Sequence, residues 1–182
     1  MIKKLSASLI AALLITGCGI DIPQGYRPSE SAVPNASITE VPIDQRTEPI
    51  EISGPGLNGG TITTEDMSGI VIVNAWASWC PPCREEWPIF VEIQNEFPEV
   101  NLLGLNEADD KTAAAEFLSS QEGRWPHISD PNQAIAAKAD VVQGSYLPGT
   151  IILDKQHRVA AKFIGPVNKE DLTRILNQLA AE

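Results

Sequence analysis

The sequence predicts a three-layer α/β domain, a sandwich in which helices flank a mixed central sheet, after an apolar leader. Two observations carry this prediction. Short apolar runs typical of buried strands alternate with segments of helical period, which favours parallel strands joined by crossover helices. Near the end of the chain, two strand-like runs are separated by a few polar residues, which predicts an antiparallel hairpin before a final helix. A sheet that contains both kinds of neighbour is mixed.

The beginning of the chain has the organisation of an export signal. Lys3 and Lys4 supply positive charge, and residues 5–15 form an apolar core of eleven residues, which is short for a membrane span. The leader ends in Leu-Ile-Thr-Gly before Cys18. This resembles the bacterial lipobox, in which the cysteine is lipidated and becomes the mature N-terminus. We expect residues 1–17 to be a lipoprotein signal peptide; the alternative is an ordinary secretory signal followed by a chance cysteine.

Residues 18–48 are predicted to form the lipidated N-terminus and a flexible tether, because prolines punctuate polar residues without a hydrophobic period. About thirty such residues span roughly 30 Å as a coil. The globular domain is expected over residues 49–182, anchored by lipid at the extracytoplasmic face of the cell membrane, where protein disulfides persist. The formal net charge is −11. So acidic a chain lacks the basic face that nucleic-acid binding requires.

The domain opens with an expected N-terminal β-hairpin, in which residues 50–52 and 61–63 alternate and glycines between them supply the turn. Residues 64–67 carry a helix-start signal that predicts one turn. The later expected elements are a buried strand over 70–76, a helix over 84–97 kinked at Pro88, a buried strand over 100–105, a helix from Asp109 or Asp110 to Ser119, an extended piece over 125–128, a short helix over 131–139, strands over 149–153 and 158–164, and a helix capped by Asn168.

The stretch Trp79-Cys80-Pro81-Pro82-Cys83 lies where the first buried strand passes into the first long helix. A Cys-x-x-Cys pair at such a junction is a redox motif with a physical rationale. Unpaired N–H groups and the dipole at the helix N-terminus favour an anion, which lowers the pKa of the first thiol and makes Cys80 the nucleophile. Cys83 follows one turn later and is close enough to resolve a mixed disulfide.

Two other interpretations of the cysteine pair stay open. The pair could be an inert structural disulfide, or half of a zinc site, which requires two further ligands. The other candidate ligands are Cys18 in the leader and His127 and His157, which are thirty residues apart and which we interpret as surface residues. We therefore expect no metal and no organic cofactor, and take the disulfide of Cys80 and Cys83 as the redox centre.

Glu86 is a candidate acid–base residue. It follows Cys83 by three residues and shares a helix face with Phe90, Ile93 and Phe97, which mark that face as buried. Burial disfavours the charged form, so we expect a raised pKa and a carboxyl group able to exchange a proton with a cysteine thiol. The alternative is a partly exposed glutamate paired with a nearby base such as Arg84.

Residues 71–88 resemble the active-site segment of the thioredoxin superfamily, and most of all its extracytoplasmic TlpA, ResA and DsbE branch. The stretch Leu147–Asp154 matches the same branch in order and spacing. The resemblance covers the whole predicted domain and implies a thioredoxin-like fold, in which Pro148 is cis and faces the cysteine pair. It also implies that substrate pairs with the backbone beside this proline, so Trp79, Leu147 and Pro148 are the expected substrate-binding residues.

The resemblance also bears on three other positions. ResA-like relatives carry a glutamate at the spacing of Glu86, which supports its role in proton transfer. Thioredoxin itself has a buried aspartate where this chain has Asn74, which cannot titrate. Gly149 stands where many relatives have a larger residue, which predicts a more open groove beside Pro148.

The function implied is that of a membrane-tethered thiol–disulfide oxidoreductase acting on protein thiols and disulfides. Many members of this branch are kept reduced by a membrane donor of the CcdA or DsbD kind and reduce apocytochrome c before haem attachment. Others of the DsbE kind oxidise secreted proteins and are recharged by a quinone-linked membrane protein. By resemblance we favour reduction. A different class of function is also open: a non-catalytic, thioredoxin-like chaperone or adaptor lipoprotein whose disulfide is structural.

Overall fold

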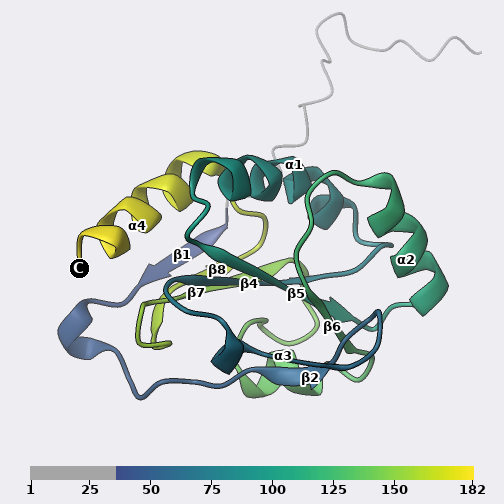
Figure 1. The fold of residues 1–182 in the computed structure, drawn as a ribbon, viewed down its shortest axis with the longest axis horizontal. Coiled ribbons are helices and arrows are strands. Elements are labelled where there is room, and N and C mark those ends of the chain that lie inside the picture. The colour runs from purple at the N-terminus through teal and green to yellow at the C-terminus, as the bar shows by residue number, and fades with distance from the viewer. Residues whose placement is uncertain (1–35) are drawn as a thin grey trace, which may run out of the picture. The chain divides into compact units, whose positions relative to one another are not determined.

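The computed structural model describes residues 36–182 (Figure 1). The predicted signal peptide, Cys18 and the first part of the predicted tether lie outside the described residues. In the described part of the chain, no helix combines the length and the apolar character that a membrane crossing needs.

The described domain is built on a six-stranded sheet whose strands follow the order β1 (Ser37–Glu40), β8 (Val159–Ile164), β7 (Gly149–Leu153), β4 (Val71–Trp76), β5 (Asn101–Glu107) and β6 (His127–Asp130). The central strand β4 pairs in parallel with β5 and antiparallel with β7. The predicted terminal hairpin is β7 and β8, which pair antiparallel. The sheet is therefore mixed, as the alternation of elements predicted.

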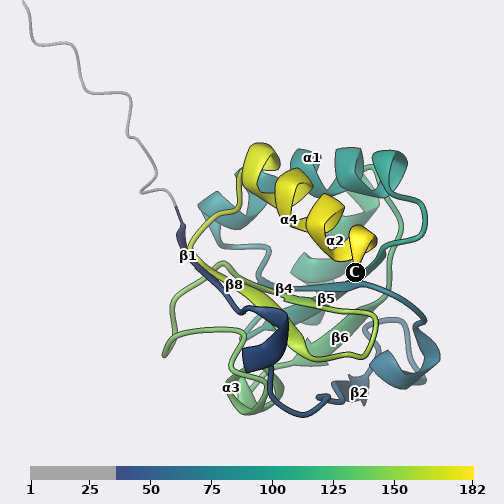
Figure 2. The same ribbon diagram turned by 90° about the vertical axis from the view of Figure 1, so that its left-hand side faces the viewer.

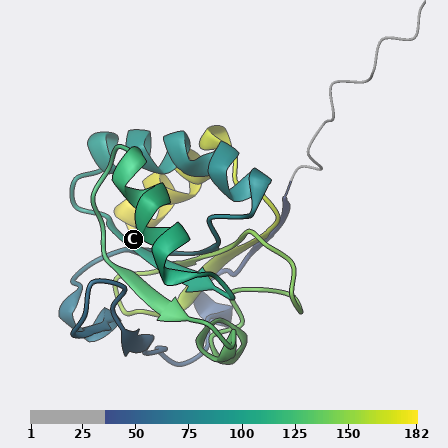
Figure 3. The same ribbon diagram turned by 90° about the vertical axis from the view of Figure 1, so that its right-hand side faces the viewer.

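Helices cover both faces of this sheet and complete the three layers. α1 (Pro81–Glu96), α2 (Lys111–Ser120) and α4 (Lys169–Ala181) lie on one face, and the short α3 (Ala134–Lys138) lies on the other (Figures 2 and 3). Beside α3 lies the small hairpin of β2 (Ser53–Pro55) and β3 (Thr61–Thr63). The predicted three-layer sandwich is confirmed.

Alternate residues of β4 reach the two cores on either side of the sheet. Ile72 packs in the cluster with α1 and α4, and Trp76 packs in a second cluster with α1 and α2. Val71, Val73 and Ala75 point to the other face, into the core shared with α3. All six residues of β4 are buried. Burial on both faces explains why this strand is a continuous apolar run rather than an alternating one.

The predicted helix starts are present. Asp110 caps α2 by accepting from the backbone N–H groups of Thr112 and Ala113, and Asn168 caps α4 by accepting from Asp171. The predicted single turn is the 3₁₀ helix η2 (Thr64–Asp66). The first hairpin strand begins at Ser53, later than predicted from residues 50–52, because the backbone of Ile52 bonds with Thr64 instead.

The prediction that the tether extends through residue 48 is wrong for the described residues 36–48. β1 pairs antiparallel with β8 at the edge of the sheet, and the 3₁₀ helix η1 (Ile43–Gln45) follows it (Figure 2). The guanidinium of Arg46 then donates to the buried Asp154 at 3.0 Å. Only Ile38 of β1 is half-buried, so the strand has little apolar pattern, and its place is set by backbone pairing that composition does not reveal.

Candidate active site

The predicted cysteine pair is a disulfide at the carboxyl end of β4, where the chain enters α1. Cys80 is the N-cap of the helix, and its Sγ accepts from the backbone N–H of Cys83 at 3.3 Å. Pro81 occupies the first helical position, where a missing N–H costs no hydrogen bond. Both sulfur-bearing residues are buried in this disulfide form. Because Cys80 lies at the N-terminus of α1, the helix dipole there favours its thiolate, as the sequence predicted.

An acidic loop clamps the segment just before the disulfide. The Asp109 carboxylate accepts from the backbone N–H of Ser78 at 2.6 Å, from the Ser78 hydroxyl at 2.8 Å, and from Asn106 at 2.8 Å. The indole N–H of Trp79 donates to the carbonyl of Ala108 at 3.1 Å. Trp79 is nevertheless 57% exposed, so it presents a fixed aromatic surface beside the cysteines. Sequence reasoning considered Asp109 only as a helix cap and missed this contact.

The predicted cis peptide bond joins Leu147 and Pro148. Leu147 is half-buried and packs against the cluster that contains both cysteines, which places this loop beside the disulfide. Tyr146, the preceding residue, is 75% exposed. The expectation that Gly149 opens a groove is wrong, because a Cβ there would lie 2.4 Å from the Val141 carbonyl; close backbone approach requires the glycine.

Glu86 is buried, as its helix position predicted. Asn74 donates to its Oε1 at 2.8 Å, and the backbone N–H of Val167 donates to its Oε2 at 2.9 Å. Burial raises the pKa of Glu86 to about 8, although both hydrogen bonds oppose the shift. The alternative pairing with Arg84 is wrong: that guanidinium is exposed and lies 5.5 Å from the centre of the Phe117 ring. Asn74, which cannot titrate, thus serves to hold the group that can.

The interpretation of His127 as a surface residue is wrong. Its Nδ1 accepts from the indole of Trp76 at 3.2 Å, and its ring stacks near Trp87. Burial lowers the pKa of His127 to about 4, so the imidazole is neutral at physiological pH. A Cβ at Gly104 would lie 2.0 Å from Nδ1, so the glycine in β5 makes this contact possible. The imidazole belongs to the aromatic core behind the disulfide, with Trp76, Trp87, Phe117 and Trp125.

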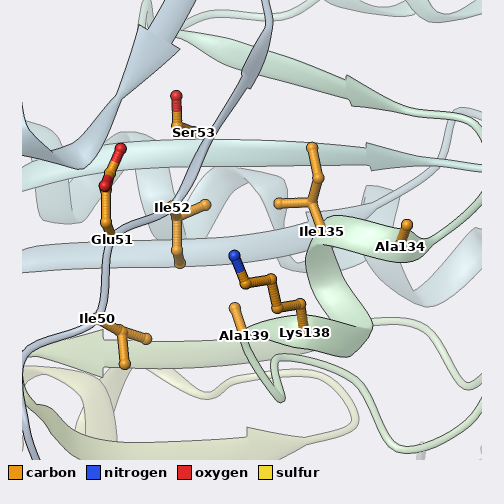
Figure 4. Close-up of a pocket in the computed structure, with 8 residues that line it drawn as sticks. All are labelled: Ile50, Glu51, Ile52, Ser53, Ala134, Ile135, Lys138 and Ala139. Carbon is orange, nitrogen blue, oxygen red and sulfur yellow. The ribbon is translucent and has the colours of Figure 1, made fainter.

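A pocket of about 510 Å³ lies away from the disulfide, between residues 50–53 and α3 (Figure 4). Figure 4 shows Lys138 reaching across it toward Ile52. None of its lining residues is a predicted site residue. Among residues 36–182, no group of three or more His, Cys, Asp or Glu side chains is arranged to hold a metal ion.

The family model described as AhpC/TSA matches residues 46–162. The chain is similar to a thiol:disulfide interchange protein DsbE homolog of Paracoccus denitrificans, at 34% identity over 128 residues and 68% of each chain. It is also similar to the thiol-disulfide oxidoreductase ResA of Bacillus cereus, at 29% identity over 126 residues, which cover 68% of this chain and 71% of that one.

Solved structures of other proteins resemble the described fold. A DsbF homologue from Corynebacterium diphtheriae superposes with a TM-score of 0.73 at 31% identity, over 84% of this chain and 96% of that one. A secreted thiol-disulfide isomerase from Corynebacterium glutamicum gives a TM-score of 0.75 at 31% identity, over 86% and 97%. The fold, the position of the cysteine pair and these relatives all point to the same protein family.

Proposed function

Because the chain belongs to the AhpC/TSA family and is a thiol–disulfide oxidoreductase of thioredoxin-like fold, we propose that it reduces protein disulfides at the extracytoplasmic face of a membrane. The observation that carries this proposal is the placement of Cys80 and Cys83. A disulfide at the N-terminus of α1, beside the exposed Trp79, is positioned for exchange rather than for cross-linking distant parts of the chain.

In the proposed reaction, the Cys80 thiolate attacks one sulfur of a substrate disulfide. A mixed disulfide forms and the other substrate sulfur leaves as a thiolate. Cys83 then attacks the Cys80 sulfur, closes the 80–83 disulfide and releases the second substrate thiolate. Two electrons pass from the cysteine pair to the substrate, and two protons from solvent or nearby acids convert the released thiolates to thiols.

Glu86 is the acid–base group of this proposal. Its buried carboxyl lies one helical turn after Cys83, on the same face of α1, and holds its proton up to about pH 8. Its ionised form, which is populated as pH approaches 8, can take the proton of the Cys83 thiol as that sulfur attacks. Its protonated form can donate a proton to the Cys83 sulfur when the disulfide is reduced again. Asn74 and the backbone of Val167 hold the carboxyl in place for both steps.

Substrate is expected to lie between the exposed Trp79 ring and the loop that carries Leu147 and Pro148. An extended peptide can pair with backbone in this loop, as family resemblance implies, while the fixed indole contacts a neighbouring side chain. Apocytochrome c is the substrate that this resemblance favours, with a membrane donor of the CcdA or DsbD kind re-reducing the pair.

Oxidation of secreted proteins is the second candidate direction. The DsbE resemblance leaves this direction open, and the similarity to a secreted thiol-disulfide isomerase at 31% identity supports a role in forming or rearranging disulfides of secreted proteins. The reduction potential of Cys80–Cys83 against glutathione buffers separates the two: a strongly reducing pair supports the first direction, and an oxidising pair supports the second.

Trapping in cells tests both the chemistry and the anchor. Cys83→Ser should accumulate mixed disulfides through Cys80, visible on non-reducing gels in the membrane fraction, because the resolving thiol is missing. Cys80→Ser should give none. Adding Cys18→Ala to the trapping variant should move the same complexes to the soluble extracytoplasmic fraction. Complexes that form with Cys80→Ser but not with Cys83→Ser would contradict the roles, and membrane retention without Cys18 would contradict the lipid anchor.

A further inference from the structure

Two buried carboxyl groups lie side by side on the face of the sheet opposite Glu86. Glu107 ends β5 and Asp130 ends β6, and the two are paired in register. Glu107 is fully buried, and within residues 36–182 neither of its carboxyl oxygens has a hydrogen-bond donor. Asp130 is also buried, but its oxygens accept three backbone N–H groups at 2.8–3.0 Å, from Ala134, Ile135 and Ala136.

The pair must hold a proton. Two adjacent buried carboxylates without a cation repel each other strongly, so one of them stays neutral. The oxygens of Asp130 act as acceptors for α3, which leaves the proton on Glu107, from where it can be donated to Asp130. Burial, and then repulsion by and hydrogen bonding to Asp130, raise the pKa of Glu107 to about 9.

In the described part of the chain, Asp130 is the charged group that acts on Glu107. Asp109, two residues further along, turns instead to Ser78 and Asn106. The other charged side chains on the elements packed against this face are exposed or paired with one another, namely Glu51, Glu65, Asp66, Lys138, Asp140 and Lys162. Lys162 is held by Asp140 at 2.8 Å. No cation from these elements neutralises Glu107.

The register of the sheet places this pair at the active-site end. In one row of side chains toward α3, Ala75 of β4 is paired with Leu105 of β5. β5 ends at Glu107, and the carbonyl of the next residue, Ala108, accepts from the indole N–H of Trp79 at 3.1 Å. Asp109 then accepts from the backbone N–H of Ser78 at 2.6 Å. Glu107 therefore lies directly before the loop that holds Ser78 and Trp79, the two residues that precede Cys80.

We propose that the Glu107–Asp130 pair is a redox-linked proton site: it binds its proton more tightly when Cys80 is a thiolate than when the disulfide is closed. This rests on the proposed exchange at Cys80 and Cys83. A reducing dithiol breaks the 80–83 S–S bond, passes two electrons to the two sulfurs and becomes a disulfide. Cys83 takes up a proton, Cys80 remains anionic, and its charge opposes ionisation of Glu107, which recovers a proton from solvent if it had lost one.

Glu107 is thus a positioning residue that tunes the cysteine pair through its charge. Glu86 lies on α1, one turn after Cys83, on one face of the sheet, whereas Glu107 lies on the other face with α3. A second proton site makes reduction of the disulfide harder as pH rises, because the reduced protein must bind an additional proton.

The decisive experiment measures the equilibrium between the protein disulfide and dithiothreitol from pH 6 to pH 10. The wild-type protein should lose reduced form with rising pH more steeply than Glu107→Gln, with an added change of up to about tenfold per pH unit near pH 9 for one proton. Glu107→Leu should behave like the glutamine variant, since both lack the titrating group. Glu116→Gln, which removes an exposed carboxylate of α2, is the control and should match wild type.

Infrared difference spectra between oxidised and reduced protein give a second readout. In a Glu86→Gln background, the carbonyl band of a protonated carboxyl group should change on reduction near pH 9, and it should vanish when Glu107→Gln is added. Identical pH dependence in wild type and the Glu107 variants would overturn the proposal, and so would the absence of this band in the Glu86→Gln protein even if the Glu107 variants fold poorly. Failure of the wild-type disulfide to exchange with dithiothreitol would instead overturn the proposed function.

Discussion

Glu86 and Glu107 are both fully buried carboxyl groups, yet the protein holds them in opposite ways. Glu86 accepts hydrogen bonds from two N–H groups, of Asn74 and Val167, which stabilise its ionised form. Glu107 receives no donor among the described residues and faces Asp130 instead. The difference decides their roles, because a carboxyl group that can be stable in both states is suited to passing a proton, whereas one that resists ionisation is suited to responding to charge.

Replacement of Glu86 by glutamine should remove a proton donor that works below about pH 8. We expect Glu86→Gln to be reduced by dithiothreitol roughly tenfold or more slowly than wild type at pH 6.5, because the leaving Cys83 sulfur loses its acid. Above about pH 9 the two rates should converge, since wild-type Glu86 has by then lost its proton. The measurement is a stopped-flow rate corrected for the thiolate fraction of dithiothreitol.

The matched control is Glu85→Gln, the exposed neighbour on the same helix, which should follow the wild-type profile at every pH. A constant ratio of wild-type to Glu86→Gln rates across the pH range would show that Glu86 only packs and hydrogen-bonds. The relay assigned to it would then be untenable.

The residues of the site that could be predicted from the sequence are those fixed by local spacing. Cys80, Cys83 and Glu86 lie on one stretch of chain, where the period of a helix tells which side chains share a face. Strand register and loop closure determine the positions of His127, Asp109 and Glu107, and a local sequence pattern does not reveal either of them. The apolar neighbours of His127, Pro126 and Ile128, were a signal for its burial, but the residue type suggested the surface.

At the scale of elements, the segment before residue 49 shows where composition misleads. Its prolines and polar residues are typical of a coil, but backbone pairing of β1 with β8 needs no apolar stripe. Two arginines then fasten the two ends of the described domain. Arg46 reaches Asp154 and Glu182, and Arg174 of α4 reaches Glu40 of β1 at 2.7 Å. The central elements, in contrast, follow their hydrophobic period closely, because most of their side chains are buried.

Arg46→Ala should destabilise the domain by about 2–4 kcal/mol, because it removes one partner of a buried ion pair. The side chains of Arg46 and Asp154 are only 4% and 3% exposed. Burial by itself raises the pKa of Asp154, but hydrogen bonds from Arg158, Arg46 and Gln156 lower it overall. Arg158 remains after the substitution, so the carboxylate keeps part of its support. Urea unfolding of the oxidised protein measures the loss.

Arg174→Ala is the informative control, since it cuts the exposed bridge between the same terminal segment and α4. Its side chain is 42% exposed and solvent screens the ion pair, so the expected loss is much smaller than that caused by Arg46→Ala. If both substitutions lower the free energy of unfolding by the same small amount, the segment with β1 and η1 contributes little to cooperative unfolding. The ion pair of Arg46 and Asp154 would then not be what holds this segment to the domain.

At the scale of the whole molecule, buried titratable groups shape how stability depends on pH. Burial raises the pKa of Glu86 to about 8 and that of Glu107 to about 9, against an ordinary value of 4.5. The folded state therefore binds more protons than the unfolded state from about pH 4.5 upward, and stability falls as pH rises through this range. Burial of His127 lowers its pKa to about 4, which has the opposite effect, but only below its ordinary value of 6.5.

Between pH 6.5 and pH 8, the two glutamates therefore act without opposition from His127. Groups with lowered pKa, such as Asp154 and Asp171, have finished titrating in both states at lower pH and add no slope here. Each buried glutamate contributes up to roughly 1.4 kcal/mol of lost stability per pH unit. The expected loss is larger than repulsion among exposed carboxylates can supply, since those are already charged in both states.

The free energy of unfolding should consequently fall by roughly 3–4 kcal/mol from pH 6.5 to pH 8, with the disulfide intact throughout. Glu86→Gln and Glu107→Gln should each remove about half of this fall, and the double variant should be nearly independent of pH in that window. The two effects should add, because the carboxyl groups lie on opposite faces of the sheet and share no partner. Urea unfolding at both pH values, repeated at high salt, tests this, because screening weakens surface charge effects and leaves buried ones. A wild-type fall that persists in the double variant would mean that groups other than these two govern the alkaline stability of the fold.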